Sequence, residues 1–380
     1  MHLNILGCRG IPPAHGGFET FAQALSLHLV RCGWDVNVYC QDDDEQFEDG
    51  QQDVWRGITR THFQSALNGP YASMQFDYKC TRHVLDMPGI DLVLGYNTAV
   101  FSLLQRLKRR RVLMNMDGIE WRRPKWAVLP KAWFMFNEMI GCNFSSVVIA
   151  DHPEIGKHLN TRTFKTPRVI PYGADVVTKS DSSYIHELGL QEDKYLISIA
   201  RIEPENSVLE IVQAAAILPA AFKIVIVGKL DEANAYHRAV YNAGRDSVIF
   251  AGGVYEKERI EALRLHSRGY LHGHKVGGTN PSLVEALGAG NPVIAHRNRF
   301  NLWTAGPEQQ FFQTSEELRE CIVRLCTNDA YAASAATAAR KRHSESFRWS
   351  TVLAKYEKML MAEHVKIETR LPIRGPERQR

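Results

Sequence analysis

The sequence predicts an α/β protein built from two successive parallel-sheet units. Short apolar runs alternate with helix-like segments from the first residues, which is typical of strand–helix–strand repeats. The 380 residues suffice for two domains of ordinary size. Two such series occur, and the stretch IPYGADVVTKSDSS between them loses periodicity and collects Gly, Asp and Ser near Val177. We therefore expect domains at 1–177 and 178–345, a helix at 346–362 and a disordered polar tail at 363–380.

The first series opens with the strand HLNILGC, followed by the loop RGIPPAHGG. A helix should follow, because Phe18, Phe21, Leu25 and Leu29 fall near helical spacing and Gly33 is a suitable residue to end it. The strand DVNVYCQ comes next. Further strands are expected at Asp91–Gly95, Arg111–Met116, Ser146–Ala150 and Arg168–Pro171.

The second series repeats the alternation of apolar strands and helix-like segments. Its expected strands are YLISIAR, FKIVIVGK, SVIFAGG, RGYLHGH and NPVIAHR. The chain then continues into RWSTVLAKYEKMLMA, whose pattern predicts an amphipathic helix.

Composition excludes several classes of protein. With 44% hydrophobic and 23% charged residues the chain is neither disordered nor fibrous, and a net charge of +4 is too small for nucleic acid to be the main partner. The start lacks the features of a signal peptide, so we expect a cytoplasmic protein. The seven cysteines form no CxxC pair, which argues against disulfides and structural zinc. The acidic run 42–49 is interpreted as an exposed loop.

Ligands of open α/β sheets bind beyond the carboxyl ends of the strands, so loops that follow strands are the candidates. The first loop, HGGFET, places Gly16 and Gly17 directly before a helix N-terminus, where a phosphate could approach the backbone closely. The alternative is a tight turn that needs positive φ. The glycines do not form G-x-G-x-x-G, so the main signal for a nicotinamide dehydrogenase is missing.

Two further loops offer charged side chains. MDGIEW places Asp117 and Glu120 beside Trp121, a set suited to sugar hydroxyls and a sugar face, although Asp117 could simply cap a helix. ARIEPEN places Arg201 at a strand end, where its guanidinium could bind phosphate through paired donors. The alternative for Arg201 is a surface ion pair.

The fourth loop, in YLHGHKVGGTNPSLVEALGAG, combines several signals. The strand carries His272 and His274 on one face, and a Gly-Gly turn then opens a helix that bears Glu285. We expect Glu285 to accept hydrogen bonds from ribose or sugar hydroxyls. The histidines lack a third ligand at zinc-like spacing, so no metal site is expected. The backbone expected to hold a phosphate comprises Gly278, Thr279, Asn280, Pro281 and Ser282.

Together, CRGIPPAHGGFETFAQAL, MDGIEWRRPKW, ARIEPEN and HGHKVGGTNPSLVEAL resemble glycosyltransferase family 4, and more narrowly a rhamnosyltransferase-like subgroup of bacterial capsule and exopolysaccharide synthesis. The resemblance covers the chain from Met1 to about Ala362. It implies a GT-B fold of two facing Rossmann-like domains, with the final helix crossing back onto the first. It also implies a nucleotide-sugar donor held mainly by the second domain, and metal-free transfer with retention of configuration.

The sequence departs from the family pattern at two positions. Gly277 stands where the first Glu of the E-x7-E pattern is usual, and Asn206 stands where a basic residue commonly follows Arg201. His274, Lys275 or Lys229 could compensate for the missing cation. Negative charge develops on the leaving phosphate during transfer, so Arg201 and backbone N–H groups would act where that charge appears. Since the leaving phosphate itself can accept the proton of the acceptor, Asp117 is assigned to positioning the sugar or acceptor.

A basic, aromatic segment suggests contact with a lipid-linked acceptor. Nine Lys or Arg residues lie between Arg106 and Phe134, against only Asp117 and Glu120. Basic side chains favour anionic headgroups and indoles favour the membrane interface. The alternative is a solvated basic face with core tryptophans. The residues expected to contact acceptor or membrane are Glu120, Trp121, Arg122, Arg123, Lys125 and Trp126.

The sequence thus predicts a sugar transferase for a bacterial surface polysaccharide that uses no cofactor, with rhamnose as the leading sugar by resemblance. It would work in the cytoplasm or peripherally on the inner face of the membrane. A catalytically silent nucleotide-sugar-binding or scaffold protein of the same fold is the first alternative, because of Gly277 and Asn206. An NAD-dependent oxidoreductase is the second.

Overall fold

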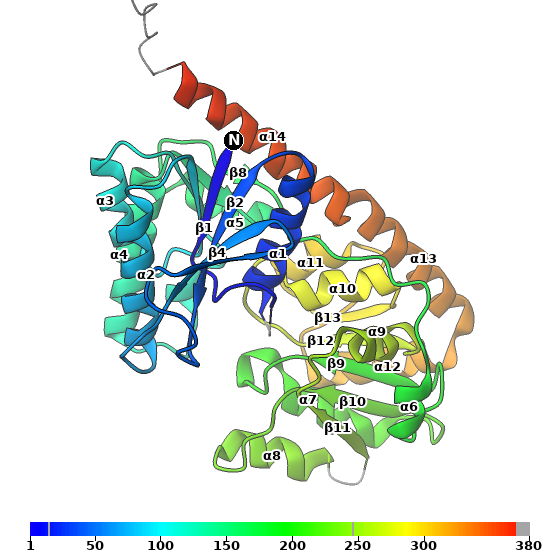
Figure 1. Ribbon diagram of the computed structural model, residues 1–380. Helices are drawn as coiled ribbons and strands as arrows, with labels where there is room; N and C mark the ends of the chain where they lie inside the picture. Colours follow the sequence, from blue (N-terminus) through cyan, green and yellow to red (C-terminus); the bar gives the residue numbers. More distant parts are fainter. Residues whose placement is uncertain (14–15, 245–246, 370–380) are drawn as a thin grey trace, which may run out of the picture. The chain divides into compact units, whose positions relative to one another are not determined.

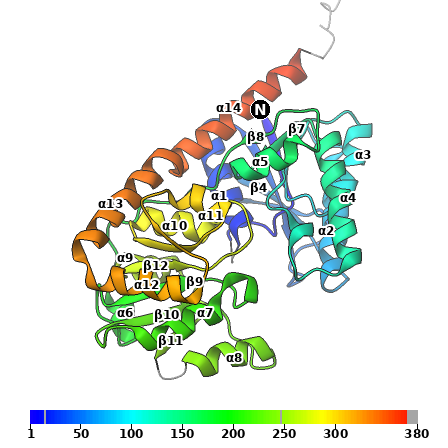
Figure 2. The same cartoon turned by 180° about the vertical axis from the view of Figure 1, so that it is seen from behind.

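The computed structural model describes residues 1–13, 16–244 and 247–369 (Figures 1 and 2). The chain forms two compact units: unit 1 comprises Met1–Ile170 together with the described residues 353–369, and unit 2 comprises Pro171–Val352. Each unit is a sheet of mainly parallel strands covered by helices, so the predicted α/β class is confirmed. The change of unit falls before the boundary expected at Val177.

Unit 1 contains an eight-stranded sheet in the order β3-β4-β2-β1-β5-β6-β7-β8, in which only the β3–β4 pair is antiparallel. The sequence analysis missed β3 and β4, because their polar residues hide the strand pattern. Thr61 donates its hydroxyl hydrogen to Asn37 at 2.8 Å, which satisfies one such residue inside the sheet. The strands are β1 (His2–Leu6), β2 (Asp35–Gln41), β3 (Gln52–Trp55), β4 (Ile58–Phe63), β5 (Ile90–Leu94), β6 (Val112–Asn115), β7 (Val147–Ala150) and β8 (Arg168–Val169).

Helices cover both faces of this sheet. Both views show α2, α3 and α4 together on one side of unit 1 and α1 with α14 on the other (Figures 1 and 2). The helices are α1 (Gly17–Arg31), α2 (Pro70–Val84), η1 (Ala99–Phe101), α3 (Ser102–Leu107), η2 (Glu120–Arg122), α4 (Val128–Phe144), α5 (Pro153–Asn160) and α14 (Trp349–Glu368).

Helix α14 extends beyond the end expected at Ala362, so the start of the polar tail at 363 was wrong. Burial explains the extension, because Glu363 is only 5% exposed and forms an ion pair with Arg111. Further along α14, the ring of Tyr356 lies 4.7 Å from that of Phe21, and Asn115 donates to its hydroxyl at 3.3 Å. The part of the predicted tail from residue 370 lies outside the described residues.

Unit 2 contains a six-stranded, fully parallel sheet in the order β11-β10-β9-β12-β13-β14. Its strands are β9 (Tyr195–Ile199), β10 (Lys223–Val227), β11 (Val248–Gly252), β12 (Gly269–His272), β13 (Val293–His296) and β14 (Gln310–Phe312). Its helices are α6 (Ser183–Glu187), η3 (Pro204–Asn206), α7 (Val208–Gln213), η4 (Ala214–Ile217), α8 (Ala235–Gly244), α9 (Lys257–Leu265), α10 (Pro281–Ala289), α11 (Arg299–Ala305), α12 (Ser315–Thr327) and α13 (Asp329–Ser346).

The sheet of unit 2 separates two hydrophobic cores. Alternate residues of each strand point to opposite faces, so Ile197 and Tyr270 join the core under α9 and α10. Their neighbours Leu196 and Leu271 join the core under α7 and α12. With both faces covered by helices, the loops at the strand ends are the parts of the sheet that remain free to bind a ligand. Among the described helices, none is both long and apolar enough to cross a membrane.

Candidate functional site

Three predicted cations follow neighbouring strands of unit 2. Arg201 follows β9, Lys229 follows β10 and His274 follows β12, and β9 pairs with both of the other strands. Because these strands are parallel, all three residues lie at the carboxyl edge of one sheet. The Arg201 side chain is 67% exposed and its Nη1 lies 3.5 Å from Oε1 of Glu203. This loose ion pair leaves the guanidinium available to a phosphate.

The backbone at this edge is closely packed. A Cβ on Gly273 would lie 2.1 Å from the carbonyl oxygen of Asn206, so only glycine fits there. Asn206 is buried and donates through Nδ2 to the carbonyl oxygen of Arg201 at 2.8 Å. It therefore fixes the turn after Arg201 and brings no charge. Lys275, a predicted substitute cation, pairs with Glu210 at 3.1 Å, whereas Lys229 is exposed.

The N-terminus of α10 is capped by its own chain. Asn280 accepts a hydrogen bond from the backbone N–H of Ser282 at 3.0 Å through Oδ1, and Pro281 has no N–H group. Pro281 therefore cannot donate a backbone hydrogen bond to a phosphate, and the N–H of Ser282 already has a partner in its own chain. It stays a prediction that the backbone N–H groups of Gly278, Thr279 and Asn280 donate to a phosphate. Thr279 is buried.

Gly277 occupies a conformation that favours glycine. Its φ is +140°, and an added Cβ would have no atom within 4 Å. A glutamate at this position would have room for its side chain but would strain the backbone. The conformation of this loop thus favours glycine over the glutamate of the family pattern.

Glu285 is held by an arginine that the sequence analysis missed. Its Oε2 lies 2.5 Å from Nη2 of Arg264, which is 5% exposed, and the same Nη2 lies 3.2 Å from Oγ of Ser282. The hydroxyl of Tyr270 lies 2.8 Å from this Oγ, and burial raises the pKa of Tyr270 to about 12, so it stays protonated. Glu285 itself remains one-third exposed at 33%. Its carboxylate is therefore both fixed in position and accessible.

The two histidines of β12 and the following loop stack on each other. The ring centroids of His272 and His274 are 4.3 Å apart at an interplanar angle of 10°. Burial lowers the pKa of His272 well below its usual value, with smaller contributions from His274 and His296, so His272 is neutral at pH 7. The carbonyl oxygen of His274 accepts hydrogen bonds from Nδ2 of Asn298 and of Asn301, each at 2.9 Å. These two asparagines, also missed by the sequence analysis, anchor the loop.

In unit 1, the loop after β1 is organised around Glu19. Gly16 has φ +109°, and a Cβ there would lie 2.1 Å from Oε2 of Glu19. Oε1 of Glu19 accepts a hydrogen bond from the backbone N–H of Arg9 at 2.8 Å. A carboxylate therefore already lies at the N-terminus of α1, which begins at Gly17, and a phosphate approaching Gly16 would meet its charge. His15 of this motif lies outside the described residues.

Asp117 follows β6 in a left-handed conformation, with φ +49°. Its backbone N–H donates to Oδ1 of Asn115 at 3.1 Å. Burial raises the pKa of the Asp117 carboxyl, and the charge of Glu120 raises it further. A strained backbone that carries a perturbed carboxyl is typical of functional sites.

The predicted acceptor-binding or membrane-contacting residues form a packed cluster. Glu120 accepts from Nη1 of Arg123 at 2.8 Å and from Nε1 of Trp126 at 3.0 Å, so both of its oxygens are engaged. Trp121 donates through Nε1 to Glu138 at 2.9 Å. These contacts favour the alternative of packed tryptophans for this part of the segment. Arg122 and Lys125 are exposed beside the indole rings.

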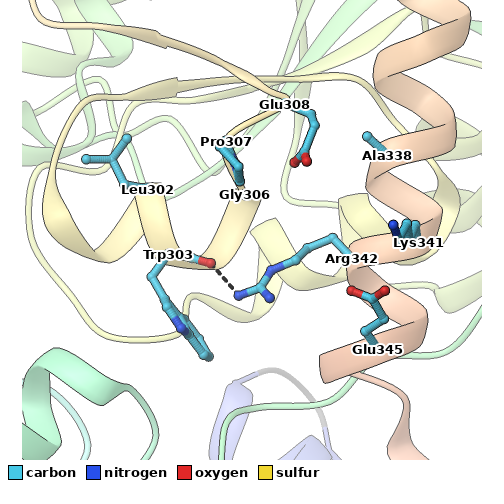
Figure 3. Close-up of a pocket in the computed structure, with 9 residues that line it drawn as sticks. All are labelled: Leu302, Trp303, Gly306, Pro307, Glu308, Ala338, Lys341, Arg342 and Glu345. Atoms are coloured by element: carbon cyan, nitrogen blue, oxygen red, sulfur yellow. Dashed lines mark hydrogen bonds between the residues drawn. The ribbon is translucent and has the colours of Figure 1, made fainter.

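A pocket of about 360 Å³ lies in unit 2 between α11 and α13 (Figure 3). Gly306 and Glu308 in its wall precede β14, so it lies toward the amino ends of the strands, away from the predicted loops. Arg342 crosses it and donates to the carbonyl oxygen of Trp303 at 2.5 Å. None of the predicted site residues lines this pocket. It is lined by Leu302, Trp303, Gly306, Pro307, Glu308, Ala338, Lys341, Arg342 and Glu345.

Solved structures with the same fold are numerous. A sucrose-phosphate synthase from Thermosynechococcus elongatus aligns with a TM-score of 0.84 at 16% identity, over 96% of this chain and 99% of that one. HepE of Anabaena in complex with UDP-glucose aligns with a TM-score of 0.72 at 17% identity, over 95% and 99%. An α,α-trehalose-phosphate synthase (UDP-forming) from Burkholderia xenovorans, in complex with glucose-6-phosphate, gives 0.71 at 10% identity, over 95% and 100%. At these identities the similarity establishes the fold, which is GT-B.

Comparison with protein families divides the chain as the fold does. Residues 1–175 match a domain of unknown function, DUF1972, and residues 182–342 match the glycosyl transferases group 1 family. No curated protein matches the chain. The carboxyl-edge loops of unit 2, with Arg201 and Glu285, fall inside the second match. Unit 2 therefore carries a glycosyl transferases group 1 domain, and the protein is a glycosyltransferase of the GT-B fold.

Proposed function

We propose that this enzyme moves a sugar from a nucleoside diphosphate donor to a saccharide or lipid-linked acceptor, with retention of configuration and without a metal ion. The observation that carries the proposal is the shared carboxyl edge of unit 2, where the exposed guanidinium of Arg201 and the fixed carboxylate of Glu285 follow neighbouring strands. The UDP-glucose bound to HepE and the glucose-6-phosphate bound to the UDP-forming synthase support a nucleotide-sugar donor and a saccharide acceptor.

The donor diphosphate would bind Arg201 and the loop before α10. As the glycosidic bond to phosphate breaks, negative charge grows on the leaving oxygen and the sugar becomes oxocarbenium-like. Arg201 and the backbone N–H groups of Gly278 and Asn280 would stabilise that charge, and preorganised donors of this kind each lower a barrier by about 3 kcal/mol. Lys229 is exposed at the end of β10 and could add a second cation.

Glu285 would bind hydroxyl groups of the donor. A carboxylate only accepts hydrogen bonds, so it suits ribose or sugar hydroxyls. Its contact with Arg264 fixes the orientation of the carboxylate, while its 33% exposure leaves it accessible to a ligand. Arg264 would therefore act as a positioning residue.

The acceptor proton needs no dedicated base in this scheme. The acceptor hydroxyl forms the new bond to the anomeric carbon on the face that the phosphate leaves, and the leaving phosphate oxygen takes its proton. Asp117 would position the sugar or the acceptor. Its left-handed backbone and raised pKa support a functional role for this carboxyl.

The class of product is proposed from the sequence motifs. Their resemblance to rhamnosyltransferase-like enzymes of capsule and exopolysaccharide synthesis favours rhamnose as the sugar and a bacterial surface polysaccharide as the product. Such acceptors are commonly built on lipid carriers, which would place the enzyme peripherally at a membrane.

The exposed face of α4 supports membrane contact. Leu129 is 82% exposed, and Phe136 and Met139, further along the same helix, are 50% and 40% exposed. They follow one another at helical spacing and form an apolar stripe. Arg122 and Lys125, exposed just before α4, complement anionic headgroups. An anionic bilayer is the partner that matches both an apolar stripe and flanking positive charge.

The second candidate is a catalytically silent nucleotide-sugar-binding protein. Two observations favour it: Gly277 leaves the site without the first carboxylate of the family pattern, and Asn206 is bound to the backbone of Arg201. Such a protein would bind the donor through the same residues but would not break the bond to phosphate.

One assay separates the two candidates. The purified chain is incubated with dTDP-, UDP- and GDP-sugars, and release of the nucleoside diphosphate is measured with and without saccharide acceptors. The transferase should release it from one donor class, and R201A and E285A should each slow release by about 100-fold or more. Binding without release on any acceptor would support the silent protein. Release that survives both substitutions unchanged would refute the proposed site.

A further inference from the structure

Three potential metal ligands meet where α14 packs on α1 within unit 1. His28 belongs to α1 and Cys32 is its C-cap residue one turn later, while Glu357 comes from α14. Nε2 of His28 lies 2.8 Å from Oε2 of Glu357 and 3.8 Å from Sγ of Cys32. The three ligand atoms all lie within 4.8 Å of one another, and no other group of three such side chains in the described part of the chain does so.

We propose that His28, Cys32 and Glu357 bind a zinc ion. Zinc bonds of about 2.0 Å to nitrogen and oxygen and 2.3 Å to sulfur put tetrahedral ligand atoms about 3.3 to 3.6 Å apart. The observed His28–Cys32 separation of 3.8 Å is close to this value. The His28–Glu357 contact of 2.8 Å needs to widen by about 0.5 Å, which a side-chain rotation supplies. Two of the three ligand pairs are thus close to zinc-binding separations before any ion binds, and the third pair lies within 4.8 Å.

The chemistry of the ligands selects the metal. One imidazole, one thiolate and one carboxylate are typical zinc ligands, whereas Mg²⁺ and Ca²⁺ prefer oxygen ligands alone. The thiolate and the carboxylate together balance the charge of a divalent ion. An ion pair alone would account for the contact between His28 and Glu357, and the thiol of Cys32 is the group that completes a metal site.

The site is open to solvent. The His28 and Glu357 side chains are 23% and 24% exposed, and Cys32 is exposed, so an ion can enter and a water molecule can fill the fourth position. The ion would join residues 329 positions apart in the sequence and fasten α14 to unit 1. Its role is structural, since it would join two helices of unit 1.

The test uses the full chain after treatment with a chelator. Zn²⁺ is titrated in competition with a chromophoric chelator, and bound zinc is counted by mass spectrometry. We expect one zinc per chain and a higher melting temperature with zinc, because the ion binds the folded state. H28Q, C32S and E357Q should each weaken binding by about 100-fold or more, since loss of groups outside the ligand shell already costs 10- to 100-fold. C321S, at a half-buried cysteine outside the cluster, should bind zinc like the wild type.

A second measurement needs no substitution. Cys32 is the exposed cysteine among those described, so a thiol reagent should modify it first, and zinc should slow this reaction at least about tenfold. Zinc binding to C32S with wild-type affinity, or no zinc bound and no thiol protection at micromolar zinc, would overturn the proposal. Removing zinc should lower the melting temperature and leave sugar transfer unchanged below it. If the wild-type chain binds zinc as expected but transfers no sugar, the proposed function fails and the zinc site stands.

Discussion

Nη2 of Arg264 lies 2.5 Å from Oε2 of Glu285 and 3.2 Å from Oγ of Ser282, so one guanidinium from α9 holds two side chains of α10. Arg264 is 5% exposed, which keeps its charge away from bulk solvent and strengthens both contacts. The orientation of the carboxylate proposed to bind the donor therefore depends on a residue from a different helix.

Substitution of Arg264 should mainly weaken donor binding. A lysine keeps the charge but cannot reach both partners from one planar group, so R264K should raise the KM for the donor about tenfold with little change in kcat. R259K, at an exposed arginine of the same helix, is the matched control. Steady-state kinetics on the three proteins decides the matter, and equal KM values in all three would remove the positioning role from Arg264.

Substitution of Arg201 should act on the chemical step. R201A should lower kcat by about 100- to 1000-fold, because a group that stabilises the charge of the leaving phosphate is lost. The control R319A removes a partly exposed arginine of α12 and should retain full activity. Single-turnover measurements would separate chemistry from product release. An R201A enzyme with unchanged kcat and a raised KM would show that Arg201 binds the donor without stabilising the transition state.

Introducing the glutamate of the family pattern at Gly277 should not improve donor binding. With φ at +140°, any side chain there strains the loop by about 1 to 3 kcal/mol. We expect G277A and G277E to lose donor affinity to a similar extent, as measured by titration with a nucleoside diphosphate sugar. If G277E exceeded both G277A and the wild type in activity, the missing carboxylate would be the limiting feature.

The Asp77 carboxyl on α2 should make stability depend on pH. It accepts a hydrogen bond from the hydroxyl of Thr98 at 2.6 Å beside a cavity of about 20 Å³, and burial raises its pKa to about 6. The folded state therefore binds this proton more tightly than the unfolded chain. The resulting stabilisation is present below pH 4 and is lost as the pH rises through 6.

Replacing Asp77 with asparagine removes this titration and keeps an oxygen that accepts from Thr98. The quantity to compare is the unfolding free energy of D77N minus that of the wild type. This difference should be about 1 to 3 kcal/mol larger at pH 7 than at pH 4. Urea denaturation at both pH values measures the difference. If D77N and the wild type differ in unfolding free energy by the same amount at both pH values, the pKa of Asp77 is the same in the folded and unfolded states.

The apolar stripe of α4 should contribute to membrane binding. L129E combined with F136E removes two apolar side chains and adds negative charge, so co-sedimentation with anionic vesicles should fall about tenfold or more. V54E combined with V176E is the matched control, because Val54 and Val176 are 73% and 53% exposed and lie outside the stripe. Equal losses in both proteins would indicate an effect of net charge alone, and no loss in either would remove α4 from the contact surface.

The sequence predicted those parts of the site that follow strands. Arg201, Lys229 and His274 were identifiable because an apolar run precedes each of them and parallel strands end at one edge. Arg264 was not identifiable, since it lies in an ordinary helical pattern and meets Glu285 only through the packing of α9 on α10. The capping of α10 by Asn280 is a local pattern that could have been read from the sequence.

The proposed zinc ligands were missed for a similar reason. A search for ligands at short spacings finds His28 and Cys32 only as two positions on one helix, and Glu357 lies 329 positions from His28. Only the packing of α14 against α1 brings the three together. The strands β3 and β4 were missed because their polar residues, such as Thr61, find partners within the sheet that periodicity cannot reveal.

Because Tyr356 and Glu363 complete the packing around Phe21 and Arg111, unit 1 is assembled from two distant stretches of the chain. A fragment ending at Ile170 would expose these surfaces to water and would lack part of its own interior. Dissecting the protein for separate study therefore requires a fusion that carries residues 353–369 back onto the first fragment. Helix α14 is thus indispensable for the folding of the beginning of the chain.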